Sequence, residues 1–249
     1  MTHFFENRLI TGITERGDHN VQHTPRNGPP AWYVCERYEN YEFRKCSFES
    51  CALSVTRDPK KRSIFRDIRL IDCQVRGCSI DTAILEDIYI ERLATHNLLC
   101  CWGSVFKHVT LKGHIGSIML SPSVAAAMAT PEEQSSFDEA NAVFYTSVDW
   151  ALDISQAEFE VEPDIRRIPA RLIRRDPETQ IVVTRGKAAS KRAVLNASDT
   201  YWGRWLCLFL DDPFKPDDVV LAVPKRHRKY KDLLDGIKLL REMGIVESE

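Results

Sequence analysis

The sequence predicts a mainly β fold with α/β additions, and three observations lead to this class. Apolar residues recur at every fifth position through much of the first half of the chain. Helix and strand signals of ordinary spacing follow in the second half. A chain of 249 residues with 43% hydrophobic content is long enough to bury a sizeable core. We therefore expect a short solenoid of strands, capped by helices and a small C-terminal α/β segment.

The five-residue spacing forms two trains separated by the polar stretch "SVTRDPKKRS", residues 54–63. Their centres are Tyr33, Tyr38, Phe43, Phe48 and Leu53, then Phe65, Leu70, Val75, Ile80, Leu85 and Ile90. A second column, mostly small or apolar, lies two positions before each centre: Ala31, Glu36, Tyr41, Cys46, Cys51, Ser63, Ile68, Cys73, Cys78, Ala83 and Ile88. Helices and strands do not repeat at five, so both columns face inward only if the chain turns a corner once per pentad. We expect residues 54–63 to project as a loop between coils.

These pentads, of which "CSFES", "CALSV", "CQVRG", "CSIDT" and "AILED" are the clearest, resemble those of the pentapeptide-repeat family. The resemblance covers about residues 31–93, becomes irregular over 98–120 and returns in "ALDISQAEFE". It implies a right-handed, four-sided β-helix whose interior is filled by the two columns. The ends of such a stack normally need capping elements.

The second half supplies candidates for these caps. Thr130 as N-cap, Pro131 after it and Glu133 at the third position predict a helix to about Tyr145. The stretches "IPARLIRR" and "TQIVVTR", with "DPE" between them, are typical of a hairpin. An amphipathic helix in "YWGRWLCLFL", a buried strand in "DDVVLAVP" and a last helix in "YKDLLDGIKLLREMG" complete the prediction.

We divide the chain accordingly into four parts. Residues 1–29 form an N-terminal extension and residues 30–120 the solenoid. Residues 121–147 form a helical insertion, and residues 148–249 a returning coil with the C-terminal α/β cap.

No pattern of catalytic chemistry stands out. The chain contains no phosphate-binding glycine loop, no zinc-protease motif and no nucleophile elbow. The pairs Cys46/Cys51 and Cys73/Cys78 lie on the small inward column, so we interpret them as packing and not as zinc ligands. His96, His108 and His114 are isolated in sequence, and we expect ordinary structural roles for them. We predict no catalytic residue, no metal ion and no cofactor.

Charge is uneven along the chain although the formal net charge is only -2. Residues 132–164 carry ten acids and no Lys or Arg, whereas residues 165–193 carry nine bases and two acids. A second basic run, "KRHRKYK", spans residues 225–231. One interpretation is that these faces are solvated or neutralise each other. The other is that the acidic stretch binds a basic partner.

The family resemblance implies two binding functions. Some members imitate the DNA duplex with an acidic β-helix and engage topoisomerases, but residues 31–120 carry 11 acids and 13 bases, which weakens that hypothesis. Others are immunity proteins, and the overall plan resembles those paired with nuclease effectors of type VI secretion. We predict a non-catalytic bacterial immunity protein that blocks the basic substrate surface of a cognate nuclease toxin. The predicted contact residues are Glu132, Glu133, Asp138, Glu139, Asp149, Asp153, Glu158 and Glu160.

Two further functional hypotheses remain open. In the first, the chain is a scaffold that uses the solenoid as a platform. In the second, it binds nucleic acid through its basic stretches. Aromatic residues are nearly absent from those stretches, so we expect no direct nucleic-acid binding. The amino terminus resembles no signal peptide and no long apolar run follows, so we expect a cytoplasmic protein with no membrane contact. We expect it to be a monomer or a dimer.

Overall fold

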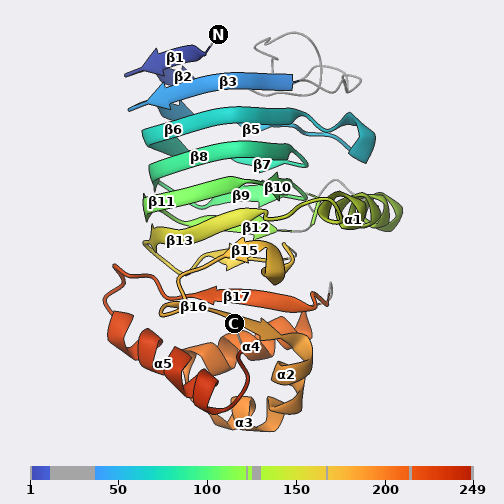
Figure 1. Cartoon of the computed structure of the whole chain (residues 1–249), viewed down its shortest axis with the longest axis vertical. Coiled ribbons are helices and arrows are strands. Elements are labelled where there is room, and N and C mark those ends of the chain that lie inside the picture. The colour runs from blue at the N-terminus through green and yellow to red at the C-terminus, as the bar shows by residue number, and fades with distance from the viewer. Residues whose placement is uncertain are drawn as a thin grey trace.

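Strand pairing in the computed structural model starts near the amino terminus and continues to residue 174 (Figure 1). The structure describes residues 2–11, 37–121, 123–124, 130–166, 168–212 and 215–247. Within them, ten strands form one sheet, with the main order β1-β3-β6-β8-β11-β13-β15, and five form a second, β14-β12-β9-β7-β5. Neighbouring strands in both sheets run parallel. The protein is therefore mainly β, with parallel sheets and some helices.

We call these two sheets the parallel stack. Its strands are β1 (His3–Glu6), β2 (Leu9–Thr11), β3 (Arg37–Arg44), β4 (Ser47–Glu49), β5 (Ala52–Leu53), β6 (Ile64–Arg76), β7 (Ser79–Asp81), β8 (Ile84–Thr95), β9 (Leu99–Trp102), β10 (Val105–Lys107), β11 (Val109–Ile115), β12 (Ile118–Ser121), β13 (Leu152–Phe159), β14 (Asp164–Ile165) and β15 (Ile173–Arg174). β1 and β2 pair with β3 and β4, so the N-terminal segment contributes strands to the stack. The predicted inward residues Ala31, Tyr33 and Glu36 lie outside the described residues.

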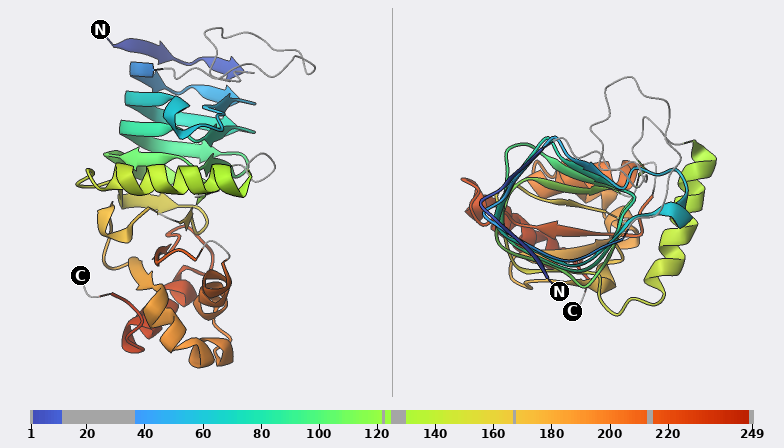
Figure 2. Two further views of the ribbon diagram at one scale, coloured as in Figure 1. Left: turned by 90° about the vertical axis from the view of Figure 1, so that its right-hand side faces the viewer. Right: turned by 90° about the horizontal axis from the view of Figure 1, so that it is seen from above.

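The chain returns to the same position after four pentads. β6 and β8 pair in register from Ile64↔Ile84 to Val75↔Thr95, an offset of 20 residues. Between β3 and β6 the offset is 27, because Arg37 pairs with Ile64 and residues 54–63 lie between the two strands. Seen from above, successive strands trace nearly the same outline (Figure 2). The pentad spacing therefore serves to bring each residue next to its equivalent in the neighbouring strand.

A corner residue accounts for the period of five. Positive φ values recur at every fifth position through the middle of the stack, at Asp67, Asp72, Gly77, Thr82, Asp87 and Arg92. This left-handed conformation turns the chain sharply, and Gly, Asp and Asn adopt it at the lowest cost. Each corner lies two residues after an apolar centre. This confirms the prediction that the chain turns once per pentad.

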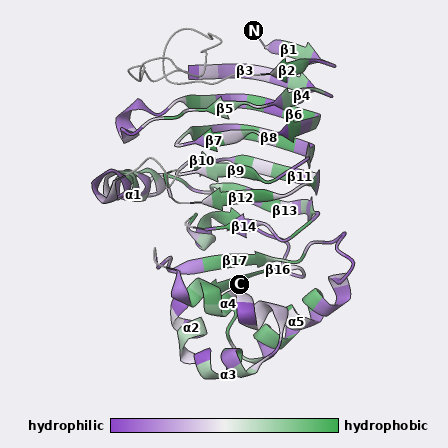
Figure 3. Ribbon diagram, turned by 180° about the vertical axis from the view of Figure 1, so that it is seen from behind, coloured by the Kyte–Doolittle hydropathy of each residue, from purple (hydrophilic) through white to green (hydrophobic). Residues whose placement is uncertain are grey.

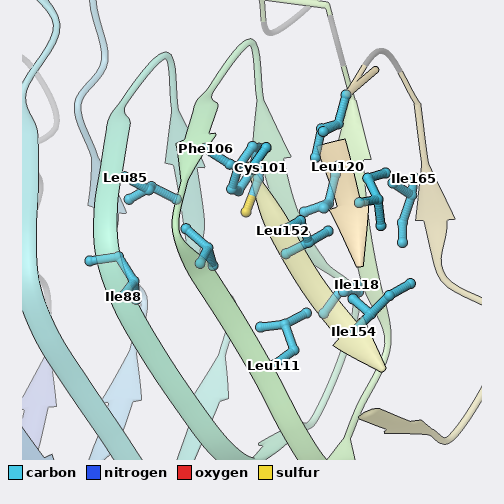
Figure 4. Close-up of a cluster of buried hydrophobic side chains, with 14 of the residues drawn as sticks. Leu85, Ile88, Cys101, Phe106, Leu111, Ile118, Leu120, Leu152, Ile154 and Ile165 are labelled. Atoms are coloured by element: carbon cyan, nitrogen blue, oxygen red, sulfur yellow. The ribbon is translucent and has the colours of Figure 1, made fainter. Parts of the chain in front are cut away.

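Both predicted columns pack into the core. Phe65, Val75 and Leu85 are buried, as are Cys46, Cys73 and Ala83 of the small column. The remaining described centres are partly buried against the same cluster. Apolar positions recur from strand to strand down the stack (Figure 3), and Leu85, Ile88, Leu111, Leu152 and Ile154 lie along its interior (Figure 4). Burial of such side chains stabilises a fold by about 1.5 to 3 kcal/mol each.

The stretch 98–120, where the repeats lose their regularity in sequence, continues the stack without a break. β9 pairs with β7 and β12, and β11 pairs with β8 and β13. A register shift interrupts each of the two β11 ladders, so the irregular spacing is absorbed locally. β13 then buries Leu152, Ile154, Ala157 and Phe159, as the returning pentads predict.

A small α/β unit closes the lower end of the stack (Figure 1). It contains an antiparallel pair, β16 (Gln180–Thr184) and β17 (Asp218–Ala222), and the helices α2 (Arg185–Ser190), α3 (Arg192–Ala197), α4 (Tyr201–Asp211) and α5 (Tyr230–Glu242). Trp202, Leu206 and Ile237 form its core. The Gln180 side chain donates to the Ile154 carbonyl at 2.9 Å, and Val182 and Val220 join the core of the stack. The predicted strand and two helices are confirmed here, whereas α2 and α3 were not predicted.

The predicted hairpin over residues 168–185 is wrong. Ile173 and Arg174 pair in parallel with Leu152 and Asp153 of β13, and the second strand, β16, pairs with β17 instead. A short 3-10 turn (Ala170–Leu172) leads into the first strand. The edge of β13 offers free backbone groups to the first strand, and the apolar β17 offers a longer partner to the second. Tertiary pairing therefore overrides the local hairpin signal.

Candidate functional site

Helix α1 (Pro131–Tyr145), which carries half of the predicted contact residues, stands on the flank of the parallel stack and not at its end (Figure 2). It begins with the predicted capping box. Thr130 Oγ1 accepts from the Glu133 backbone N–H at 3.3 Å, and the Thr130 N–H donates to Glu133 Oε2 at 2.8 Å. A capping box of this kind fixes where the helix starts. The chain leaves the stack after β12 and returns at β13, so α1 is a lateral insertion between two strands.

A buried arginine from the projecting loop fixes this helix to the stack. Arg62 is 3% exposed, and its Nη2 donates to Asn141 Oδ1 at 2.5 Å and to the Gly103 carbonyl at 3.2 Å. Its guanidinium lies 4.8 Å from the centre of the Phe137 ring. Burial lowers the pKa of Arg62 to about 10, so it remains charged at neutral pH. We call these contacts the Arg62 clamp; it joins residues 54–63, the inner face of α1 and the stack.

The four acids of α1 differ in their surroundings. Glu132 and Glu139 are exposed. Glu133 is occupied by the capping box and lies 3.9 Å from Arg57, and Asp138 accepts from the Gln134 side chain at 2.9 Å. Hydrogen bonds from its own backbone N–H and from Thr130 lower the pKa of Glu132, which favours its charged form. The outer face of α1 thus presents two unburied carboxylates beside Val143, which is 70% exposed.

Asp149 belongs to a cluster at a corner of the stack. His108 lies between two carboxylates, with Nδ1 2.9 Å from Asp87 and Nε2 2.7 Å from Asp149. The His108 ring is 4.7 Å from that of Trp150, and the Arg174 guanidinium lies 4.1 Å from the Trp150 ring centre. His108 has a positive φ and follows the corner Asp87 by 21 residues. We call this group the His108 cluster; it attaches the segment after α1 to the stack.

The cluster favours a charged histidine. Burial alone would lower the pKa of His108, but the hydrogen bonds to Asp149 and Asp87 outweigh it and raise that pKa above its usual value. The same hydrogen bond to His108 lowers the pKa of Asp149. An imidazolium between two carboxylates is an ion-paired arrangement that holds the two segments together.

The three remaining predicted acids lie on or just after β13 and have basic or hydroxyl neighbours. Asp153 accepts from the Ser155 hydroxyl at 2.6 Å, Glu158 lies 3.3 Å from Arg226, and Glu160 lies 3.9 Å from His114. Arg226 belongs to the basic run 225–231, so that run and the acidic stretch neutralise each other in part. This observation supports the interpretation of mutually neutralising faces at this point.

The structure therefore divides the eight predicted residues into two kinds. Those with the exposed carboxylates, which we call the acidic band, are Glu132, Glu139, Asp149 and Glu160. Glu133, Asp138, Asp153 and Glu158 are partly buried and hydrogen-bonded or ion-paired. Among the aromatic residues that alternate with these acids, Tyr145 and Phe159 are buried in the core, whereas Trp150 is partly exposed.

Arg62, Asp87 and His108 complete this region and were not singled out as functional in the sequence. The sequence did contain a signal for Asp87 and His108, because residues about 20 positions apart occupy equivalent corners of successive turns. Arg62 gave no such signal, since its partner Asn141 is 79 residues away. His96 contacts Gln74 and His114 contacts Glu160, whereas His108 lies between Asp87 and Asp149. The three histidines named in the sequence analysis therefore make separate contacts.

Comparison of the chain with protein-family models, with curated proteins and with solved structures gave no match. Every helix in the described ranges is too short or too polar to cross a membrane.

Proposed function

We propose that this chain is a non-catalytic immunity protein that binds a basic, secreted nuclease toxin through the acidic band. The observation that carries the proposal is the placement of α1. This helix is inserted sideways between β12 and β13, which are consecutive in the chain but belong to different sheets, and it is held there by the buried Arg62 clamp, while its outer face exposes Glu132, Glu139 and Val143. A fixed, protruding acidic helix fits the groove in which a nuclease holds phosphates.

The fold that we propose for the parallel stack is a right-handed, four-sided β-helix of the pentapeptide-repeat type. The 20-residue register between β6 and β8 and the left-handed corner at every fifth residue support it. The immunity function rests on the resemblance of the overall plan to immunity proteins of type VI secretion effectors. It also implies that the protein acts in the bacterial cytoplasm.

The outer face of the stack argues against the alternative of DNA mimicry. A mimic needs continuous rows of negative charge, whereas acids and bases alternate here from strand to strand. Arg66 lies 3.4 Å from Glu39 on one side and donates to Glu86 on the other at 2.8 Å. Arg69 lies 3.7 Å from Glu42 in the neighbouring strand. The charges of this face are therefore largely compensated within the protein.

Capture of the partner tests the proposed function. Tagged full-length chain is cross-linked in its native cells and purified, and the captured proteins are identified by mass spectrometry. We expect a basic nuclease, which the purified chain then inhibits in a DNA- or RNA-cleavage assay. Capture of topoisomerase subunits instead, or a captured nuclease whose activity is unchanged by the chain, would contradict the proposal.

Two triple variants test whether the acidic band makes the contact. Glu132→Lys, Glu139→Lys and Glu160→Lys change the band and leave the His108 cluster intact. Asp217→Lys, Asp232→Lys and Glu242→Lys change the net charge equally at exposed positions of the C-terminal unit. We expect the first triple to lose the nuclease and the second to retain it. Equal capture by both triples would exclude the band as the binding surface.

A further inference from the structure

Two cysteines face each other in neighbouring strands of the parallel stack. Ala52 and Ser79 are register partners in β5 and β7, which places the preceding residues, Cys51 and Cys78, side by side. The Ser79 backbone N–H donates to the Cys51 carbonyl at 2.9 Å. Neighbouring strands are about 4.8 Å apart, which falls within the range of Cα separations that a disulfide spans. The two residues are not joined by a disulfide in this structure.

A second pair provides an internal comparison. Cys46 and Cys73 precede the register partners Ser47 and Gln74, so they are neighbours in the same way one pentad earlier. Their thiols also donate to carbonyls of their own and the preceding strands. Cys46 and Cys73 are 0% and 2% exposed, however, whereas Cys78 is partly exposed. The two pairs share their backbone geometry and differ in the exposure of one member, because Cys51 is 5% exposed and so is buried like Cys46 and Cys73.

The corner residue before each second cysteine also differs between the pairs. Gly77 precedes Cys78, and apart from its chain neighbours the only atom within 4 Å of a Cβ added there is Ser50 Oγ at 3.9 Å. Asp72 precedes Cys73, and its carboxylate is ion-paired with Arg92 across the corner. The corner before Cys78 therefore carries no side chain, whereas the corner before Cys73 carries an ion-paired carboxylate.

We propose that Cys51 and Cys78 form an oxidisable dithiol site that reacts with hydroperoxides, whereas Cys46 and Cys73 are inert packing residues. This inference is independent of the proposed function. The Cys78 thiolate attacks a peroxide oxygen, which gives a sulfenic acid and releases the other oxygen as water or an alcohol. The Cys51 sulfur then displaces water from that sulfenic acid to form the disulfide. Overall, two thiols lose two hydrogens and one hydroperoxide is reduced.

The environments of the sulfurs support these different roles. A side-chain hydrogen bond from Cys51 lowers the pKa of Cys78 to about 6, which favours the reactive thiolate at neutral pH. Burial raises the pKa of Cys73 and keeps it as a thiol. A partly exposed thiolate beside a second cysteine that can resolve it is the arrangement found in redox-sensing sites.

The disulfide is expected to be easily reduced. Side chains at register positions leave the sheet nearly parallel, so their Cβ atoms stay about 4.8 Å apart, compared with about 3.8 Å in relaxed disulfides. Disulfides under strain are the ones that cellular reductants reverse. A disulfide between Cys51 and Cys78 would close a loop of the chain that contains residues 54–63, including Arg62. Oxidation would therefore restrict the movement of the segment that carries Arg62.

Peptide mapping of the full-length protein tests the site. Reduced protein is treated with hydrogen peroxide, its remaining thiols are alkylated, and it is digested with trypsin. Cleavage after Arg76 separates Cys73, in residues 70–76, from Cys78, in residues 77–92, while residues 46–57 carry Cys46 and Cys51. We expect residues 46–57 to be linked to 77–92, and dithiothreitol to reverse the link. A link to 70–76 in equal or greater yield would overturn the proposal, as would no link at all.

Three single variants identify the roles of the sulfurs. Cys51→Ser is expected to leave a sulfenic acid on Cys78 that dimedone labels, and Cys78→Ser to abolish both the link and the label. Cys73→Ser, the matched control, should leave the link unchanged. Serine already occupies the same column at Ser63, so these variants are compatible with the fold. In the wild type, Cys78 should be alkylated at least about tenfold faster than Cys73. Equal alkylation rates would overturn the proposal independently of the disulfide.

Discussion

The buried Arg62 guanidinium donates to the Asn141 side chain at 2.5 Å and thereby joins the projecting loop to helix α1. Replacing Arg62 with Met keeps most of the side-chain volume but removes this bond and the one to the Gly103 carbonyl. The buried Gly103 carbonyl and the partly buried Asn141 side chain then lose a donor, which typically costs about 1 to 3 kcal/mol. We expect urea unfolding to report a loss of that size, and limited proteolysis to cut α1 first.

Arg57→Met is the matched control for this prediction. Arg57 lies in the same loop, but half of its side chain is exposed and it approaches Glu133 only to 3.9 Å. Exposed pairs of this kind contribute less than about 1 kcal/mol. If Arg62→Met and Arg57→Met had the same effect on unfolding and proteolysis, the Arg62 clamp would have no special role.

The corner residues give a second prediction. Asp67 is exposed and has a φ of 52°. A β-branched side chain is strained in this conformation, so Asp67→Val should destabilise the protein by about 1 to 2 kcal/mol. Asp67→Gly should change the stability by less than about 0.5 kcal/mol, because glycine accepts positive φ. Ala94→Val, on an exposed position of β8, controls for the added valine, and thermal unfolding compares the three variants.

Two helical glycines should respond to alanine with opposite signs. Gly236 in α5 packs against the buried Trp202, and an added Cβ would lie 2.7 Å from Trp202 Cδ1. Gly236→Ala should therefore destabilise the protein by about 1 to 3 kcal/mol, although alanine favours helices. Gly186 in α2 has nothing within 4 Å of an added Cβ, so Gly186→Ala should stabilise by up to about 1 kcal/mol. Stabilisation by both changes in urea unfolding would contradict the described packing of α5 on α4.

The His108 cluster predicts a pH dependence of stability. The pKa of His108 is raised in the folded state, so its contribution is complete below the usual histidine value of about 6.5 and disappears as the pH rises through the folded pKa. The pKa of Asp149 is lowered, so its contribution is lost only as the pH falls below the usual aspartate range. Wild type should therefore exceed His108→Gln in unfolding free energy more at about pH 5.5 than at about pH 8.5.

The groups that face His108 are Asp87, Asp149 and Trp150, with Arg174 beyond the indole ring. Subtracting the two unfolding free energies at each pH removes the contributions of all other titrating residues. A difference between wild type and His108→Gln that stayed constant over this range would show that the ion pairs contribute nothing to stability.

Most of the fold could be predicted from the sequence because its signals are local. The pentad columns follow from side-chain size at fixed spacing, and the start of α1 follows from Thr130 and Glu133, which bond to each other. The hairpin could not be excluded in the same way. Whether Ile173 pairs with its neighbour in sequence or with Leu152 depends on which strand edge is free, and that is a property of the assembled stack.

For the candidate site, the sequence predicts which residue types are present but not which of them are exposed. The run of acids over residues 132–164 is plain in the sequence, but nothing there separates Glu139, which is exposed, from Glu158, which lies beside Arg226. The Arg62 clamp and the His108 cluster depend on contacts between distant coils. Predicting the site would therefore require knowledge of which residues of distant coils come into contact in the stack.

The rate of association with the captured nuclease, measured as a function of salt, tests the central claim most directly. If the acidic band docks on a basic surface, the association rate constant of wild type should fall by at least about tenfold as the salt rises from about 50 to 500 mM. The Glu132→Lys, Glu139→Lys, Glu160→Lys triple should associate at least about tenfold more slowly at low salt, with a flatter salt dependence, while the C-terminal triple behaves as wild type. Identical rates and salt slopes for the band triple and wild type would contradict the account.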